Sequence, residues 1–160
     1  MSRSAPNSAV IEVLNEVLTA ELTAINQYFL HAKMCQSWGY ARLAGYLRKE
    51  SIDEMKHADA VIERILYLGG LPNLQRLWHL RIGETVPEQF TSDLALENEA
   101  IPRLQKGVEQ LRAAGDVGSA LLLEGILRAE EEHKDWLEMQ LELIEQIGLQ
   151  NYLARQMHGG

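Results

Sequence analysis

The chain has 160 residues, about the length of one globular domain. Its hydrophobic fraction of 46% and charged fraction of 24% are those of a folded protein, which excludes extensive disorder and low-complexity classes. The 15 basic and 23 acidic residues give a formal net charge of −8, which argues against nucleic-acid binding and is compatible with handling cations.

The single cysteine, Cys35, excludes an intramolecular disulfide framework and every cysteine-rich zinc or iron–sulfur site. The N-terminal stretch MSRSAPNSAV has no apolar segment typical of a signal peptide, and no apolar run reaches the roughly 18 residues that a membrane span needs. We therefore expect a soluble cytoplasmic protein that binds neither a membrane nor nucleic acid.

Apolar residues at helical spacing predict a first helix over about Ala9–Ser37, with Ser8 as its N-cap and Gly39 closing its end. The same periodicity predicts a second helix over about Ala41–Leu68, which a pair of glycines ends. Residues 71–85 contain proline, asparagine and glycine without a clear period, so we interpret them as a long connection.

A third helix is predicted over about Pro87–Ala114, since proline suits a first helical turn, and Pro102 inside it is expected to cause a kink. A fourth helix follows over about Gly118–Ile147, and a short fifth helix lies within residues 149–157. The 15-residue connection can extend about 50 Å, which is enough to run the length of the bundle and make the second and third helices parallel.

The predicted fold class is therefore all-α: a four-helix bundle with one long crossover connection and a short fifth C-terminal helix. Residues 1–160 are expected to form a single domain. The alternative is a structural bundle without any functional site, and the arrangement of the polar residues distinguishes the two.

Two histidines have a glutamate three residues earlier, in the pairs Glu54–His57 and Glu130–His133. Residues three apart share a helix face, so each pair is able to point at one metal ion. By composition alone this pattern is weak evidence for a metal site, because the chain has many glutamates and such pairs also arise by chance. The other histidines have no such partner and are expected at the surface or in structural roles: His31, His79 and His158.

Two further glutamates occupy matching positions. Glu21 lies 33 residues before Glu54, and Glu97 lies 33 residues before Glu130. The midpoint of each interval falls at a predicted turn, and residues equidistant from the turn of an antiparallel hairpin lie side by side. All four carboxylates are therefore predicted near the middle of the long helices.

A second matched pair shows that spacing alone is not decisive. Glu12 and Glu88 both lie 42 residues before the glutamate of a Glu-x-x-His pair. They are nine residues from Glu21 and Glu97, which at about 100° per residue is the opposite helix face. Apolar residues surround Glu21 and Glu97, whereas polar residues surround Glu12 and Glu88, so the first pair is predicted to face the core.

Four glutamates and two histidines at mid-bundle need compensation, because taking an ionised carboxylate out of water costs several kcal/mol. No matched core lysine or arginine is available. Two divalent cations would supply the missing positive charge, and carboxylate and imidazole ligands suit iron, manganese or zinc. The alternative is a solvated polar seam or a misassigned helix face.

The chain also resembles the bacterioferritins, the haem-binding branch of the ferritin family. The matching segments are ELTAINQYFLHAKM, ESIDEMKHADAVIERILYLGGLPNLQ, SDLALE and EEEHKDWLEMQLELIEQIGLQNYL, which cover nearly the whole chain in order. The resemblance implies a homo-oligomeric shell of 24 subunits with ferroxidase activity. Such a shell oxidises Fe(II) with dioxygen or peroxide and stores ferric mineral for iron storage and detoxification.

The resemblance assigns two irons per subunit to six side chains. The terminal ligands would be Glu21 and His57 for one iron and Glu97 and His133 for the other, with Glu54 and Glu130 bridging both. Tyr28, seven residues from Glu21, would be a redox-active tyrosine beside the site. The alternative is a core tyrosine whose hydroxyl is satisfied by a ligand carboxylate.

Met55 directly follows Glu54, and from pattern alone a helical methionine is more often a packing residue. By resemblance, Met55 from two subunits across a two-fold axis would ligate one haem b, so one haem would serve two subunits. The chain has no C-x-x-C-H motif for covalent attachment. Haem would assist electron transfer for iron release, with a small ferredoxin as the partner that the family implies.

Three positions depart from the family pattern. Lys49 replaces a common histidine that, with the acid at Asp53, binds iron on the inner surface, while Ala129 and Gly69 replace common acids. Two other di-iron classes fit less well. A rubrerythrin-like peroxidase usually needs cysteine pairs, and a DNA-protecting mini-ferritin has a different ligand spacing.

Overall fold

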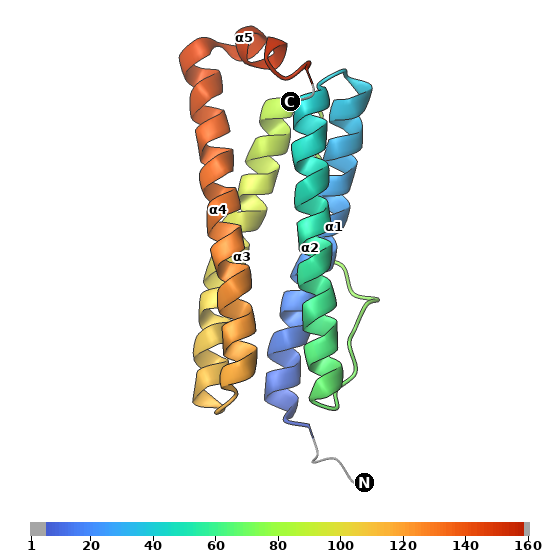
Figure 1. Ribbon diagram of the computed structural model, residues 1–160, viewed down its shortest axis with the longest axis vertical. Coiled ribbons are helices and arrows are strands. Elements are labelled where there is room, and N and C mark those ends of the chain that lie inside the picture. The colour runs from blue at the N-terminus through green and yellow to red at the C-terminus, as the bar shows by residue number, and fades with distance from the viewer. Residues whose placement is uncertain (1–5, 159–160) are drawn as a thin grey trace.

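The protein is described by a computed structural model in which residues 6–158 are placed. This part of the chain forms five helices, as predicted: α1 (Ser8–Ser37), α2 (Ala41–Tyr67), α3 (Val86–Ala113), α4 (Val117–Ile147) and α5 (Leu149–Ala154). The four long helices form a bundle, and the short α5 lies across one end of it (Figure 1). The predicted fold class is confirmed, and every long helix begins and ends within about a residue of its predicted bounds.

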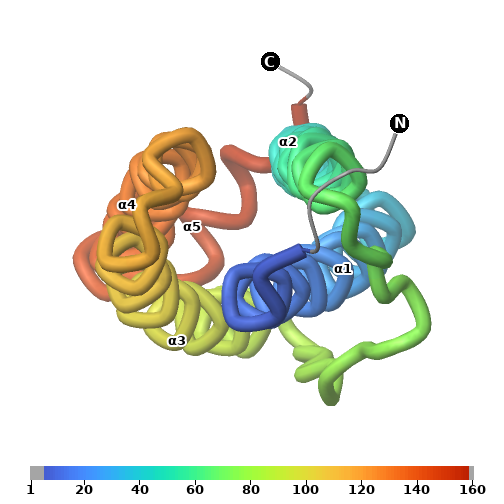
Figure 2. Tube along the Cα trace, turned by 90° about the horizontal axis from the view of Figure 1, so that it is seen from below, coloured from blue at the N-terminus to red at the C-terminus, as the bar shows by residue number. Residues whose placement is uncertain are grey.

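The connections also follow the prediction. Short turns join α1 to α2 and α3 to α4, so each pair is antiparallel (Figure 1). The long connection between Tyr67 and Val86 returns along the outside of the bundle, next to α1 and α2, so that α2 and α3 run parallel (Figure 2). In the described part of the chain, no helix combines the length and apolarity that a membrane span requires.

The start of α1 corrects the predicted N-cap. The N-cap of α1 is Asn7 and not Ser8, because the Asn7 carboxamide oxygen accepts hydrogen bonds from the backbone N–H groups of Ala9 (3.0 Å) and Val10 (3.4 Å). Ser8 is itself the first helical residue. Pro102 lies inside α3, which continues beyond it to Ala113.

The apolar core is divided into two clusters along the bundle axis. One cluster packs the N-terminal halves of α1 and α4 against the C-terminal halves of α2 and α3, and it includes Leu14, Val61, Leu111 and Leu123. The other lies toward α5 and includes Leu43, Phe90, Leu137 and Tyr152. The buried residues of all four helices between these clusters are largely polar, so the fold holds a buried polar layer between two apolar ends.

The long connection is fixed to α1 by side chains of that helix. Four acceptors spaced along α1 each receive a backbone N–H of the connection: Asn15 from Asn73, Thr23 from Trp78, Gln27 from Arg81 and His31 from Gly83. The irregular segment therefore satisfies these backbone donors without secondary structure of its own.

Candidate metal centre

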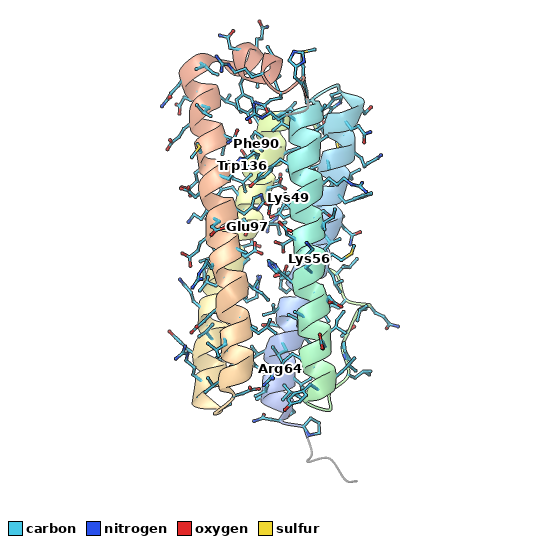
Figure 3. The ribbon with its side chains drawn as sticks, in the orientation of Figure 1. Lys49, Lys56, Arg64, Phe90, Glu97 and Trp136 are labelled. Atoms are coloured by element: carbon cyan, nitrogen blue, oxygen red, sulfur yellow. The ribbon has the colours of Figure 1, made fainter. Side chains whose placement is uncertain are left out.

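Six side chains converge in the polar layer between the two core clusters. They come from all four long helices: Glu21 on α1, Glu54 and His57 on α2, Glu97 on α3, and Glu130 and His133 on α4. Figure 3 shows Glu97 at this level, between Phe90 and Trp136 toward the α5 end and Arg64 toward the other end. The four glutamates and His133 are at most 3% exposed, whereas the His57 side chain is 20% exposed.

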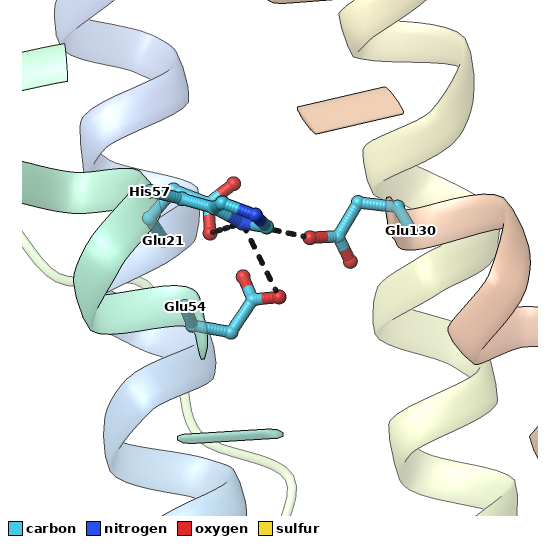
Figure 4. Close-up of side chains that lie close together, drawn as sticks. All are labelled: Glu21, Glu54, His57 and Glu130. Atoms are coloured by element: carbon cyan, nitrogen blue, oxygen red, sulfur yellow. Dashed lines mark ion pairs between the residues drawn. The ribbon is translucent and has the colours of Figure 1, made fainter. Parts of the chain in front are cut away.

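The first half of the centre is grouped around His57 (Figure 4). Its Nδ1 lies 3.6 Å from Glu21 Oε2, 3.7 Å from Glu54 Oε1 and 3.5 Å from Glu130 Oε1. One potential ligand atom of each of these four residues lies within 4.8 Å of the others, which is compact enough for one metal ion. The first half thus combines side chains of α1 and α2 with a carboxylate of α4.

The second half of the centre consists of Glu97, Glu130 and His133, which also offer ligand atoms within 4.8 Å of one another. His133 Nδ1 lies 3.2 Å from Glu97 Oε1. Glu130 belongs to both halves and has the position of a bridging carboxylate. Glu54 is grouped only with the first half, so its expected bridging role stays a prediction.

Burial sets the protonation of these carboxyl groups. Desolvation raises the pKa of Glu130 from 4.5 to about 8, and the neighbouring Glu54 charge adds to this. Desolvation also raises the pKa of Glu21, Glu54 and Glu97. Burial therefore disfavours the ionised form of these carboxyl groups, and full ionisation of all four would require positive charge beside them.

The pKa values of the two imidazoles are also raised, which favours their charged form. Burial disfavours charge on His57, but the nearby carboxylates of Glu130, Glu21 and Glu54 outweigh it and raise its pKa to about 12. The pKa of His133 is raised in the same way, against desolvation, by Glu97. Two imidazolium charges cannot neutralise four carboxylates, so the centre keeps a deficit of positive charge.

Several polar atoms of the centre have no hydrogen-bond partner, although they are buried. They occur on five of its six residues: Glu21 Oε2, His57 Nδ1, Glu97 Oε2, Glu130 Oε1 and His133 Nε2. A buried polar atom without a partner costs about 1–3 kcal/mol. Carboxylate oxygens and imidazole nitrogens with free lone pairs are the donor set that divalent first-row metals bind, so two such ions fit the charge and the unsatisfied atoms together.

Tyr28 lies against this centre from α1. It is fully buried, its hydroxyl donates a hydrogen bond to Glu97, and its ring centre is 5.0 Å from that of His133. Burial and the nearby Glu97 charge raise its pKa well above the ordinary value, so the phenol keeps its proton. The hydroxyl is satisfied by a candidate ligand carboxylate, and the ring lies beside a candidate ligand imidazole.

Met55 lies outside the centre. Its side chain is 56% exposed, on the outer side of α2. Ile52, three residues earlier on the same face of α2, is also exposed. The departure at Lys49 has a visible consequence, because its ammonium group lies 3.6 Å from Asp53 and competes with any cation there.

The structure adds polar residues that the sequence did not assign to the site. Glu50 Oε2 lies 3.8 Å from His133 Nδ1. Asp93 Oδ1 accepts hydrogen bonds from Gln27 (2.9 Å) and from His31 Nδ1 (2.9 Å), and Asp93 is fully buried. Asp93 is four residues before Glu97, so its position on the same face of α3 was the available signal.

Comparisons with known proteins identify the family to which this helical bundle belongs. A ferritin-like domain family matches residues 11–147. A bacterioferritin of Streptomyces coelicolor is 57% identical over 145 residues, which cover 91% of this chain and 87% of that protein. Bacterioferritins of Mycobacterium leprae and Rhodobacter capsulatus are 54% and 43% identical, each over 146 residues covering 91% of this chain and 92% and 91% of those proteins. The chain therefore belongs to the bacterioferritin branch of the ferritin family.

Proposed function

We propose that this protein stores iron and that its candidate metal centre is a ferroxidase site for Fe(II). The observation that carries the proposal is the convergence of four buried glutamates and two histidines, five of them with unsatisfied buried atoms, between two apolar core clusters. A purely structural layer would leave these atoms without partners. Fe(II) is the substrate, and the family relationship supports it as the metal.

The proposed ligands are the terminal pairs Glu21–His57 and Glu97–His133, with Glu130 and Glu54 shared between the two irons. Each Fe(II) gives up one electron. Hydrogen peroxide takes up both electrons and two protons to yield two water molecules, or dioxygen takes up two electrons and two protons to yield peroxide. The carboxylates offset the rise in metal charge, because the centre begins with more acid than its imidazoles neutralise.

Tyr28 is proposed as an auxiliary electron donor to this reaction. Its phenol donates a hydrogen bond to Glu97, so an electron lost from the ring leaves together with a proton that Glu97 accepts. The high pKa of Tyr28 keeps that proton in place until oxidation occurs. Tyr28 would thereby couple the loss of an electron to the transfer of a proton to Glu97.

We further propose a single domain of residues 1–160 that assembles as a shell of 24 copies, with iron mineral inside. The exposed Met55 is suited to ligate haem b together with the partner subunit across a two-fold axis, because its side chain is accessible on the outer side of α2. Haem bound there would supply electrons for reduction and release of stored iron, with a small ferredoxin as donor. Gel filtration tests this assembly, because 24 chains of 18.1 kDa should elute together at about 430 kDa.

An anaerobic titration of metal-free protein with Fe(II) tests the ferroxidase proposal. Two tightly bound irons per chain are expected, followed by oxidation when dioxygen or peroxide is added. Glu54→Ala and Glu130→Ala should each remove tight binding. Glu12→Gln is the matched control, because Glu12 is exposed on the opposite side of α1.

Binding of fewer than two irons by the wild type, or unchanged binding by both alanine variants, would leave only a structural bundle. Haem is tested separately by the visible spectrum. A Soret band that is present in protein expressed with ample haem and lost in Met55→Leu supports the haem assignment, and its absence from the wild type refutes it.

A further inference from the structure

A small cavity adjoins the candidate metal centre on the side of α1 and α3. Its volume is about 20 Å³, which is room for about one water-sized molecule. One wall consists of four carboxylates of the centre: Glu21, Glu54, Glu97 and Glu130. The remaining wall consists of the small side chains Ala20, Ala24 and Ala100 and the larger side chains Trp78, Leu96, Glu99 and Arg103.

Trp78 and Arg103 close this cavity together. The Trp78 backbone N–H donates to Thr23 Oγ1 at 3.0 Å, and the Thr23 hydroxyl donates in turn to the Thr19 carbonyl at 2.7 Å, so α1 holds this point of the long connection. The guanidinium carbon of Arg103 lies 4.2 Å from the centre of the Trp78 ring, within the range of a cation–π contact. An aromatic ring and a fixed positive charge thus form the closure.

Arg103 also lines a much larger groove of about 490 Å³ between α1 and α3. That groove is lined by charged side chains of both signs, including Glu12, Glu16, Arg76 and Lys106. The two spaces share Arg103, which therefore separates the open groove from the cavity beside the carboxylates. Burial lowers the pKa of Arg103, yet a guanidinium stays charged at neutral pH; Glu99 lines the same cavity, so the partition carries charges of both signs.

Such a closure discriminates by size. A hydrated divalent cation carries a water shell that does not fit into about 20 Å³. Dioxygen and hydrogen peroxide are neutral and have only two heavy atoms. On the other side of the centre, the partly exposed His57 and Glu50, whose side chain is 12% exposed, both belong to α2.

We propose that the cavity closed by Trp78 and Arg103 is the pocket through which the oxidant, a small neutral molecule, reaches the two irons, while cations and bulkier molecules are kept out. This inference rests on the proposed ferroxidase function. The reaction keeps the balance given above: two Fe(II) ions lose one electron each, and the oxidant in the pocket takes up both electrons and two protons.

Filling the pocket is the first test. Ala100→Leu places three extra carbon atoms against the cavity, and its matched control is Ala113→Leu, an exposed site on the same helix. In Ala100→Leu, the second-order rate constant for oxidation by dioxygen should fall at least tenfold, while two Fe(II) still bind anaerobically at the wild-type rate. The anaerobic association rate of nitric oxide, a neutral diatomic probe, should fall in parallel.

Opening the pocket is the second test, and it does not depend on Ala100→Leu folding. Cumene hydroperoxide oxidises two Fe(II) with two protons to give its alcohol and water, but it is too bulky for the closed cavity. Trp78→Ala should raise the rate with this peroxide, relative to hydrogen peroxide, at least tenfold. Lys106→Gln is the control, because Lys106 lines the outer groove but not the cavity.

The outcomes separate the two proposals. If the wild type neither binds two Fe(II) nor oxidises them, the ferroxidase function itself fails. If the wild type is active but Ala100→Leu oxidises iron and binds nitric oxide at wild-type rates, or if Trp78→Ala leaves the peroxide ratio unchanged, the pocket assignment is wrong and the ferroxidase function stands.

Discussion

Replacing Glu130 by glutamine should stabilise the metal-free protein although it removes a central ligand. The pKa of Glu130 rises from 4.5 in the unfolded chain to about 8 in the folded protein. At about 1.4 kcal/mol per pH unit, this difference costs the folded state about 3 kcal/mol at pH 7. Glutamine keeps the shape and cannot ionise, but it weakens the pairing with His57, which loses one of three carboxylate partners.

Allowing about 1–2 kcal/mol for that lost ion-pair contact, the net gain is about 1–2 kcal/mol, or about 2–8 °C in the midpoint of thermal unfolding for a chain of this size. The assay is a thermal melt at pH 7 with a chelator present, together with an anaerobic Fe(II) titration. Glu131→Gln is the control, since Glu131 is its exposed neighbour on α4. A Glu130→Gln variant that melts below the wild type, or that still binds two irons tightly, would refute the reasoning.

Two further outcomes are expected. Between pH 6.5 and 8, the metal-free protein should lose stability as the pH rises. The folded-state pKa values of Glu130 (about 8) and His57 (about 12) both exceed the unfolded ones, so the folded state binds more protons; a chelated sample that melts higher at pH 8 than at pH 6.5 would contradict this. Gly83→Ala should destabilise the protein by about 2–4 kcal/mol in chemical unfolding, because its Cβ would lie 2.3 Å from the Gln89 backbone nitrogen. Gly45→Ala, whose Cβ meets nothing within 4 Å, should be neutral or stabilising; equal effects of the two substitutions would count against this explanation.

The helices and the level of the centre could be predicted because both follow from periodicity. Long apolar repeats interrupted by glycine define four helices, and the equal 33-residue intervals from Glu21 to Glu54 and from Glu97 to Glu130 place four carboxylates at one height. The same argument separates Glu12 and Glu88 from the core, and the structure leaves both exposed. Helical geometry converts spacing into direction, so no long-range contact had to be guessed.

What the sequence could not predict depends on contacts between elements. The long connection has no period, so nothing in it indicated that Trp78 would meet Arg103 or that Gly83 would donate to His31. The grouping of Glu130, rather than Glu54, with both halves of the centre depends on side-chain rotamers that spacing does not fix. The first cap shows the same limit, since both Asn7 and Ser8 are good N-cap residues and only the backbone geometry selects Asn7.

A crystal of the metal-free protein soaked anaerobically with a ferrous salt tests the central claim most directly. Anomalous scattering at the iron edge should show two neighbouring peaks per chain, about 3.5–4 Å apart, surrounded by the six side chains of the centre. Glu130 should contact both peaks, as its membership of both ligand groups predicts. A single peak, or iron bound only at the exposed acids of the surface, would contradict a two-iron centre and the oxidation chemistry proposed for it.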